Sequence, residues 1–361
     1  MAIAFVIVFA VAVIGASRWQ LNEYAITPGQ STNVTPLVSV KGLATNAHPD
    51  QVNFVDVWLQ QLSMLQYVRM QFEKNVTFVS GQQLEEPGVP TSELVAQGYQ
   101  QMNDAKVAAE AAALRALGWT LTPTATGAVI TGVTAESPAS TAGLKVQDRI
   151  VAANGHAVTS SCGLVAVLHA MPAGTHLTLT IVKQGFTAIG VPTTGATVTV
   201  HLVTAGPPAG AQGDGCPGVN GVDRSFIGVG LEDGVRYNFP ATFAINTASI
   251  GGPSAGLAMT VAILDLLSKG SLTGGHTIAT TGTIDAYGNV GEVGGVAQKT
   301  IAVENAGVKY FFVPAGEAAV AQSEATPGFH VIGVTTLAQV LTYLHRMGGS
   351  LPVSITPPAK P

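Results

Sequence analysis

The sequence predicts an α+β protein in three parts, and three observations lead to this prediction. An uninterrupted apolar run occupies residues 1–16. Residues 117–204 consist of short β-like runs separated by turn residues, a pattern typical of a β-rich domain. From Ser225 to about Gly348 the pattern alternates between strands and helices. We therefore expect an N-terminal transmembrane helix, a β-rich domain and a domain of mixed strands and helices, in that order.

The composition favours a folded, loop-rich protein with a substantial core. Apolar residues make up 47% of the 361 positions, and charged residues make up 10%, against roughly 25% in an average soluble domain. The high apolar content argues against disorder, and the 42 Gly and 20 Pro residues indicate many turns. The net charge is −5 and the sequence contains no basic run, so no nucleic acid partner is expected.

The apolar run at residues 1–16, MAIAFVIVFAVAVIGA, contains no polar side chain. A helix of that length is ~24 Å long, against a hydrocarbon core of ~30 Å, and continuing it through Leu21 makes up the difference. Trp19 and Tyr24 suit the interfacial belt of a membrane. We predict a single-pass signal anchor at residues 1–21, with a cleaved signal peptide and a buried core helix as open alternatives. No Lys or Arg precedes the run, so the sequence leaves its orientation undetermined.

Residues 22–116 are expected to form an N-terminal α/β segment. Its clearest element is an Ala-rich helix from Ser92 to Leu117, which Gly118 ends. Two further segments are expected to lie outside the domains, namely a Gly/Pro-rich linker at residues 205–224 and a tail at residues 349–361.

The two cysteines, Cys162 and Cys216, lack the spacing of a zinc or redox site. Two free thiols and a disulfide both stay open, because a disulfide requires this part of the chain to lie outside the cell. The eight histidines are scattered along the chain, so no metal site and no cofactor are expected.

The run ESPASTAGL, followed after three residues by DRIVAANG, spans residues 136–155 of the β-rich region. Ser137 and Pro138 predict the start of a short helix, and Asn154-Gly155 predicts a hairpin turn. The run resembles bacterial PDZ domains of the kind attached to envelope proteases, so residues 117–204 are expected to form a PDZ-like domain. Gln147 departs from the resemblance, because bacterial PDZ domains usually have Gly there.

The PDZ resemblance implies a groove in which an extended peptide adds a strand to an exposed sheet edge. It places the carboxylate-binding loop near Leu117, Gly118 and Trp119. The resemblance also implies that Leu164 and Leu168, on the second helix of the domain, face the groove. The alternative is that these apolar residues belong only to the core.

Residues 250–259 read IGGPSAGLAM and open an apolar stretch that predicts a buried helix from Ala255 onward. Pro253 suits the first turn of a helix. Ser254 would then lie at the helix N-terminus, where free backbone N–H groups can hold an oxyanion. We therefore interpret Ser254 as a candidate nucleophile, with the amides of Gly252 and Ser254 as oxyanion donors.

The same residues also match G-x-S-x-G, the nucleophile elbow of α/β-hydrolases. That fold needs an acid and a histidine after the serine, and Asp265 or Asp285 with His330 or His345 could supply them. The chain after Ser254 is short for such a fold, and a PDZ-like module stands where its sheet should begin. No G-x-x-x-x-G-K-S/T motif occurs, so no nucleotide is expected as a partner.

Residues 281–299, TGTIDAYGNVGEVGGVAQK, predict a strand, a turn, a second strand and a Gly-Gly entry into a helix. Lys299 falls in the first turn of that helix, among mostly apolar neighbours. Desolvation near a helix N-terminus can lower the pKa of a lysine by ~3 from its usual value of ~10.4. Lys299 could then accept the proton of Ser254.

Three runs, GGPSAG, TGTI, and VGGVAQK followed by AVENAGVKYFFVP, resemble the proteolytic domain of Lon proteases. The order of anchor, PDZ-like domain and Lon-type domain is similar to that of a family of PDZ-containing membrane peptidases of Gram-positive bacteria. The resemblance implies that Ser254 is the nucleophile, that Lys299 is the general base and that the Thr281 hydroxyl orients Lys299. Gly251 departs from it, because ATP-dependent Lon enzymes commonly have Asp three residues before the serine.

We therefore expect an ATP-independent serine endopeptidase, with its Lon-type domain at residues 225–348, that hydrolyses unfolded or flexible protein segments. Protein or peptide substrates and the membrane are the expected partners, and a homo-oligomer is compatible with the sequence. By analogy with the family, the peptidase domain lies on the outer side of the cell membrane. Two alternatives stay open, namely a non-catalytic PDZ adaptor and a protein that processes only itself, for example within residues 205–224.

Overall fold

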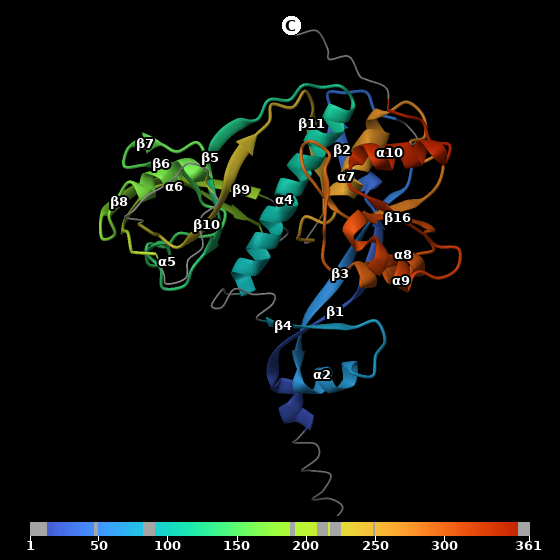
Figure 1. The fold of residues 1–361 in the computed structure, drawn as a ribbon, viewed down its shortest axis with the longest axis horizontal. Coiled ribbons are helices and arrows are strands. Elements are labelled where there is room, and N and C mark those ends of the chain that lie inside the picture. The colour runs from blue at the N-terminus through green and yellow to red at the C-terminus, as the bar shows by residue number, and fades with distance from the viewer. Residues whose placement is uncertain are drawn as a thin grey trace, which may run out of the picture.

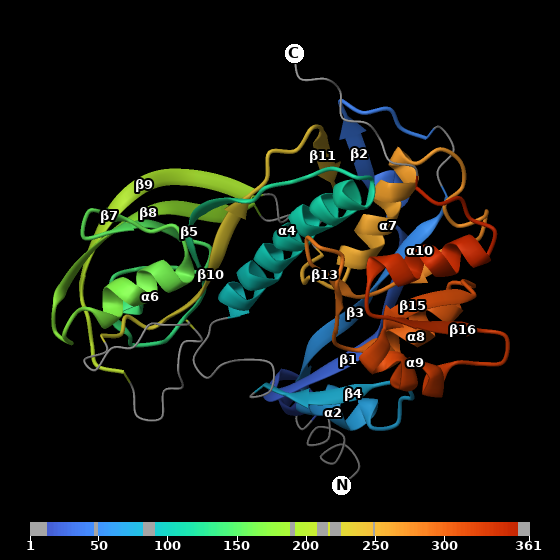
Figure 2. The same cartoon turned by 45° about the horizontal axis from the view of Figure 1, so that its top comes forward.

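The structure is a computed structural model. It describes residues 13–46, 50–81, 91–187, 192–207, 216, 225–247 and 250–352. Two sheet-based units lie side by side, and the long helix α4 (Thr91–Ala116) runs between them (Figure 1). Figure 2 shows α4 against the larger unit, with the smaller, strand-rich unit on its other side.

The larger unit contains a six-stranded sheet in the order β16-β15-β12-β3-β1-β4. β12 pairs in parallel with both β3 and β15, β15 pairs in parallel with β16, and β1 is antiparallel to β3 and β4. The strands are β1 Gln20–Asn33, β3 Val52–Ser63, β4 Thr77–Ser80, β12 Ile278–Thr280, β15 Tyr310–Pro314 and β16 His330–Val334. Strands of the segment 22–116 thus lie in one sheet with strands of the segment 225–348.

Helices cover both faces of this sheet. On one face, α4, α7 and α10 share a core with Phe54 and Phe312, and on the other face α8 and α9 share a core with Val55 and Phe311. Sequence neighbours enter opposite cores because side chains alternate along a strand. The helices are α7 Gly256–Leu267, α8 Val296–Asn305, α9 Ala318–Glu324 and α10 Leu337–Arg346, with the 3-10 turn η2 Ala315–Glu317 before α9.

The Ala-rich helix predicted from the sequence is α4. Its small side chains, including Ala109 and Ala113, are fully buried and allow close packing against α7. Gly118 follows with a φ of 89°, a left-handed conformation that favours glycine and ends a helix. The prediction for this element is therefore confirmed.

The smaller unit is an antiparallel sheet in the order β10-β5-β6-β8-β9, with β7 paired to β6. Ser137 caps α5, and Asn154-Gly155 forms the turn between β6 and β7, as the sequence predicted. The elements are β5 Thr124–Val133, α5 Pro138–Thr141, β6 Arg149–Ala153, β7 His156–Ala157, α6 Ser161–His169, β8 His176–Phe186, β9 Pro192–Val203 and β10 Val229–Arg236. β10 comes after the predicted linker, so this sheet uses residues beyond 117–204.

Several short elements complete the fold. A two-stranded pair joins β2 to β11, and another joins β13 to β14. These elements are η1 Thr35–Leu37, β2 Val38–Lys41, α2 Met64–Met70, β11 Thr242–Ile245, β13 Thr283–Ile284 and β14 Val290–Gly291.

Most of the predicted anchor lies outside the described residues, which begin at residue 13. Residues 13–18 are helical, but β1 begins at Gln20, so the expected continuation of the helix through Leu21 is wrong. The physical reason is that the backbone from Gln20 onward pairs with β3. In the part of the chain that the structure describes, no helix is long and apolar enough to cross a membrane. Most of the predicted linker and tail also lie outside that part.

Candidate active site

Ser254 lies in the loop that leads into α7. Ala255 is the N-cap of the helix, so Ser254 stands one residue before the cap, and eleven of the twelve helix residues are buried. The burial follows from the apolar sequence, and it fixes the direction in which the N-terminus of α7 points. Gly256 is required at the first helical position, because a Cβ there would lie 3.1 Å from the Ile284 amide nitrogen.

Lys299 lies in the fourth position of α8 and is only 2% exposed. Its amine donates a hydrogen bond to the Thr281 hydroxyl at 3.2 Å. Burial lowers the pKa of Lys299 to about 8, while the carboxylates of Glu317 and Asp56 oppose part of that effect. A substantial fraction of Lys299 is therefore neutral near pH 8, and a neutral amine can accept a proton.

Thr281 connects the lysine to the serine loop. It follows β12, and its N–H donates to the Phe312 carbonyl at 2.9 Å. Its hydroxyl accepts from Lys299 and donates to the Ser254 carbonyl at 3.4 Å, and the Gly282 N–H donates to the same carbonyl at 3.0 Å. The backbone of Ser254 and the amine of Lys299 are thus held by one threonine.

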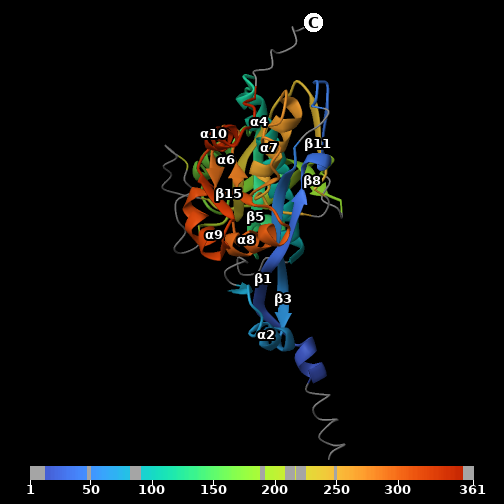
Figure 3. The ribbon, with the colours of Figure 1, turned by 90° about the vertical axis from the view of Figure 1, so that its right-hand side faces the viewer.

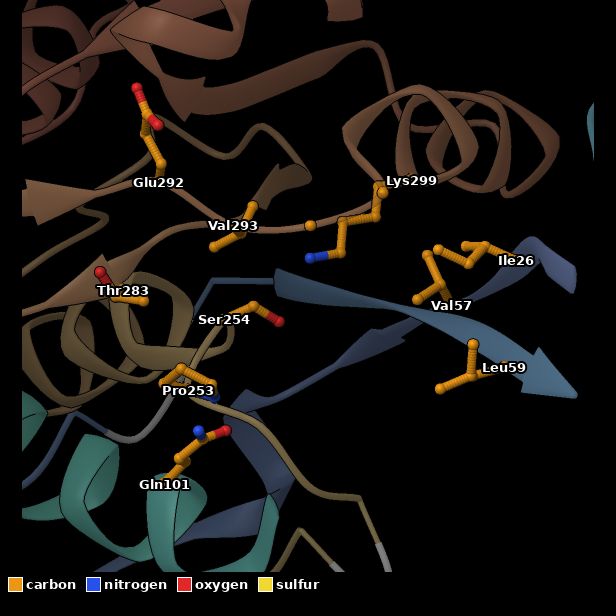
Figure 4. Close-up of a pocket in the computed structure, with 12 residues that line it drawn as sticks. Ile26, Val57, Leu59, Gln101, Pro253, Ser254, Thr283, Glu292, Val293 and Lys299 are labelled. Atoms are coloured by element: carbon orange, nitrogen blue, oxygen red, sulfur yellow. The ribbon is translucent and has the colours of Figure 1, made fainter. Parts of the chain in front are cut away.

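Ser254 and Lys299 line a single cavity of about 570 Å³. Figure 4 shows the Ser254 hydroxyl and the Lys299 amine projecting into this space from opposite sides. Within the described part of the chain, no hydrogen bond joins the two groups, an arrangement that is common before a substrate is bound. The other lining residues are Ile26, Val57, Leu59, Gln101, Pro253, Thr283, Glu292, Val293, Gly294 and Gly295.

Two family profiles match the sequence. Residues 115–188 match the PDZ domain, and residues 246–344 match the C-terminal proteolytic domain of Lon protease. The second match contains both Ser254 and Lys299.

The chain contains a PDZ domain and a Lon-type proteolytic domain.

Three curated relatives are named Lon protease or Lon protease 2. The chain is 38% identical to that of Koribacter versatilis over 94 residues, 34% to Lon protease 2 of Bacillus subtilis over 107 residues, and 43% to that of Metamycoplasma arthritidis over 63 residues. These matches cover 25, 30 and 18% of this chain but only 11, 18 and 7% of the relatives. Among solved structures, a PDZ domain of an SdrC-like protein from Listeria monocytogenes aligns at 17% identity and a TM-score of 0.22, covering 30% of this chain and 90% of that one.

One expected oxyanion donor is already engaged. The Gly252 N–H donates to the Gly98 carbonyl of α4 at 2.8 Å, so this amide does not point into the cavity. The prediction for Gly252 is therefore corrected, because a distant helix that the local sequence does not reveal takes its hydrogen bond. The Ser254 amide, next to the N-terminus of α7, stays the predicted donor to an oxyanion.

The contact with Gly98 also explains the glycine that replaces the acid of ATP-dependent Lon enzymes. A Cβ at Gly251 would lie 3.1 Å from the Gly98 carbonyl carbon, and a Cβ at Gly98 would lie 3.7 Å from the Gly251 Cα. Gly251 thus lets the serine loop approach the α4 backbone closely, whereas the contact at Gly98 would be an ordinary one. The carboxylates near the lysine come instead from Asp56 on β3 and from Glu317 beside α9, which the sequence analysis did not single out.

Four of the five predicted peptide-binding residues lie in or against a hydrophobic core, and Gly118 is exposed. Leu117 is fully buried, and Trp119 packs against the same core of the proteolytic domain. Gly118 serves as the left-handed end of α4. Leu164 and Leu168 are buried in the core of the PDZ domain. The groove prediction for these residues is thus corrected, because their side chains are used in packing.

The strand beside α6 is β10, which lies at the end of the PDZ sheet. Asp233 of β10 accepts hydrogen bonds from the Ser161 N–H and hydroxyl at 2.7 and 2.6 Å, at the N-terminus of α6. A peptide strand added to this sheet beside α6 would therefore meet β10. The sequence analysis missed this strand because it follows the predicted linker.

The structure answers one question that the sequence left open, the state of the cysteines, and tests one residue pair of the hydrolase-type alternative. Cys162 on α6 and Cys216 form a disulfide. Of the residues of the hydrolase-type alternative, Asp265 is fully buried, where its carboxylate accepts from the Asp50 and Leu272 amides. His330 stacks on Tyr310 and does not line the cavity of Ser254. A hydrolase-type triad built on these two residues is not formed.

Proposed function

We propose that this protein is a membrane-anchored, ATP-independent serine endopeptidase that uses a Ser254–Lys299 dyad. The observation that supports it best is the shared cavity, in which a half-buried serine faces a buried lysine whose pKa is lowered to about 8. A buried lysine with a lowered pKa beside a serine at a helix N-terminus suits general-base activation of a hydroxyl. The Lon-type profile over residues 246–344 supports a peptidase.

The mechanism begins with a substrate carbonyl beside Ser254. As the Ser254 oxygen forms a bond to the carbonyl carbon, its proton passes to the neutral amine of Lys299. The amide of Ser254 stabilises the oxyanion, and Thr281 keeps the lysine aligned. The C–N bond then breaks as Lys299 returns the proton to the leaving amine, and water releases the acyl group by the same steps in reverse.

The substrates we propose are unfolded or flexible protein segments. No P-loop motif occurs in these 361 residues, and activity without ATP is part of the proposal. Ile26, Val57 and Leu59 give the cavity an apolar wall that would suit an apolar substrate side chain. The PDZ domain would bind substrate segments or tails by strand addition at β10 beside α6.

Membrane anchoring and an extracytoplasmic location are parts of the same proposal. The apolar residues 1–16 support an anchor, although most of them lie outside the described residues. The disulfide between Cys162 and Cys216 supports an oxidising compartment, because disulfides are rare in the reducing cytosol.

The experiment that tests the proposal is cleavage of an unfolded protein by the full chain, in detergent and without ATP. Ser254→Ala and Lys299→Ala are expected to abolish cleavage. Thr281→Val is expected to lower kcat by about 10- to 100-fold with little change in KM, since general-base catalysis contributes about 10²- to 10⁴-fold. His330→Ala and His345→Ala serve as controls that keep activity.

The results of this experiment distinguish the proposed peptidase from the alternative functions. Loss of activity in a histidine variant would contradict the dyad. Wild-type protein that cleaves no peptide or protein, but binds peptides, would favour the PDZ adaptor. Cleavage confined to the chain itself and lost in Ser254→Ala would favour self-processing.

A further inference from the structure

Helix α2 turns an apolar stripe toward solvent. Met64, Leu65 and Val68 are 38, 40 and 49% exposed, and Phe72 in the following turn is 86% exposed. At about 100° per residue, Met64, Leu65 and Val68 fall within about 100° of one another around the helix axis, and Phe72 lies just beyond the end of the helix. A surface helix normally turns such a stripe toward the core.

The opposite side of α2 is already packed, so the stripe cannot be buried by a rotation of the helix. Tyr67 contacts Phe78 of β4 edge to face, with ring centroids 5.2 Å apart. Ser63 and Gln66 form a capping box that fixes the start of the helix. The exposed stripe is therefore a fixed feature of the fold, and a partner from outside is needed to cover it.

The stripe lies where the apolar N-terminal run joins the fold. The Met64 N–H donates to the Trp19 carbonyl at 2.9 Å, and Gln20 pairs with Ser63. Trp19 itself is 64% exposed. Figure 3 shows α2 and the short helix before β1 together at one end of the molecule, where β1 begins and β3 ends. The described part of the chain therefore begins close to this stripe, and residues 1–12, which precede it in the sequence, are all apolar.

The charges beside the stripe favour a lipid surface. Arg18, Arg69 and Lys74 are exposed. Glu73 is paired with Arg69 at 3.1 Å. An apolar helix face with basic residues at its border suits the boundary between acyl chains and anionic headgroups, and tryptophan suits the same depth.

We propose that the stripe formed by Met64, Leu65, Val68 and Phe72, together with Trp19, lies in the headgroup region of an anionic lipid bilayer. This proposal rests on the membrane anchoring proposed above and not on the peptidase activity. α2 lies flat on the membrane and provides a second contact that fixes the orientation of the body. Ser63, the N-cap of α2, lies four positions along β3 from Leu59, which lines the cavity, a distance of ~13 Å. The cavity is thus held close to the bilayer, where segments next to a substrate's own membrane helix can reach it.

The test measures depth in the membrane for the full chain. The variants Val68→Cys, Phe72→Cys and Val320→Cys are labelled with an environment-sensitive fluorophore, without reducing the native disulfide. They are reconstituted into vesicles of phosphatidylcholine and phosphatidylglycerol that contain a quencher lipid. Val320 on α9 is the matched control, because it is 49% exposed like Val68 and also lies on a helix.

Several-fold quenching is expected at positions 68 and 72, and little is expected at position 320. Adding Val68→Glu to the Phe72→Cys variant should reduce the quenching at position 72, whereas adding Val320→Glu should not. Vesicle-bound protein with equal quenching at 68 and 320 would overturn the proposal and leave the anchor intact. Protein that does not bind vesicles would overturn both the stripe proposal and the membrane anchor. Cleavage of an unfolded protein by the same sample would still test the peptidase proposal separately. Cross-linking between position 68 of two copies, without quenching, would assign the stripe to a contact between copies and overturn the proposal.

Discussion

The burial of Lys299 predicts that this proposed general base destabilises the fold that holds it. Its pKa falls from 10.5 to about 8 on folding. At ~1.36 kcal/mol for each pKa unit, the protonated lysine costs ~3 kcal/mol of folding free energy at pH 7. Lys299→Met removes this cost and also removes the hydrogen bond to Thr281, worth about 1 kcal/mol. The variant should therefore be inactive yet more stable than the wild type by about 2 kcal/mol at pH 7.

The contribution of Lys299 to the free energy of unfolding depends on pH, and the sign of this dependence follows from the lowered pKa. Below pH 8 both the folded and the unfolded protein hold the proton, so the full cost is present. Between pH 8 and 10.5 the folded protein loses the proton that the unfolded chain keeps, so this contribution to stability rises with pH. The stability advantage of Lys299→Met should accordingly shrink as the pH approaches 10.

Urea denaturation at pH 7 and pH 10 measures both effects. Lys309→Met is the control, because Lys309 is exposed and the substitution is the same. A Lys299→Met variant that is less stable than the wild type at pH 7, or whose advantage is equal at both pH values, would refute this account of the lysine.

Three further predictions concern residues around the site. Glu317→Gln removes a carboxylate that raises the pKa of the active-site lysine, so the alkaline rise of kcat/KM should move to lower pH. Gly251→Asp should lower the free energy of unfolding by about 1–3 kcal/mol in urea because its Cβ meets the α4 backbone, whereas Gly294→Ala, with open space around it, should not. Gln147→Ala should lose about 1 kcal/mol of stability with its hydrogen bond to Ala96, and Gln147→Gly should recover part of this by relieving a φ of 78°.

The local features of the site could be predicted from the sequence. The loop before α7 and the entry into α8 are defined by glycines and apolar runs within a few residues, and local chemistry decides such features. The long helix α4 and the PDZ elements at residues 136–155 were predictable for the same reason. The resemblance to Lon proteases then brought Ser254, Lys299 and Thr281 together, and the structure places all three around one serine loop.

The predictions that were wrong concern contacts between parts of the chain that are distant in sequence. Leu117 and Trp119 look like part of a PDZ loop locally, but they follow α4 and pack in the core of the other domain. β10 joins the PDZ sheet from beyond the linker, and strand pairing over that distance leaves no local pattern. The Gly252 amide was expected to be free because its acceptor, on α4, lies far away in sequence.

The arrangement around α4 shows why the two domains are not independent units. Within three consecutive residues, the Ala96 carbonyl accepts from Gln147 and the Gln97 side chain donates to the Thr131 carbonyl, both in the PDZ domain. The next residue, Gly98, accepts from the Gly252 amide in the serine loop. A movement of the PDZ domain against this turn of α4 must therefore break these bonds or shift the loop that holds Ser254. If the PDZ domain has two positions relative to α4, a peptide that binds both equally well leaves the Ser254 loop unchanged. A peptide that binds one position more tightly shifts the loop toward the matching conformation, by the difference between its two binding free energies.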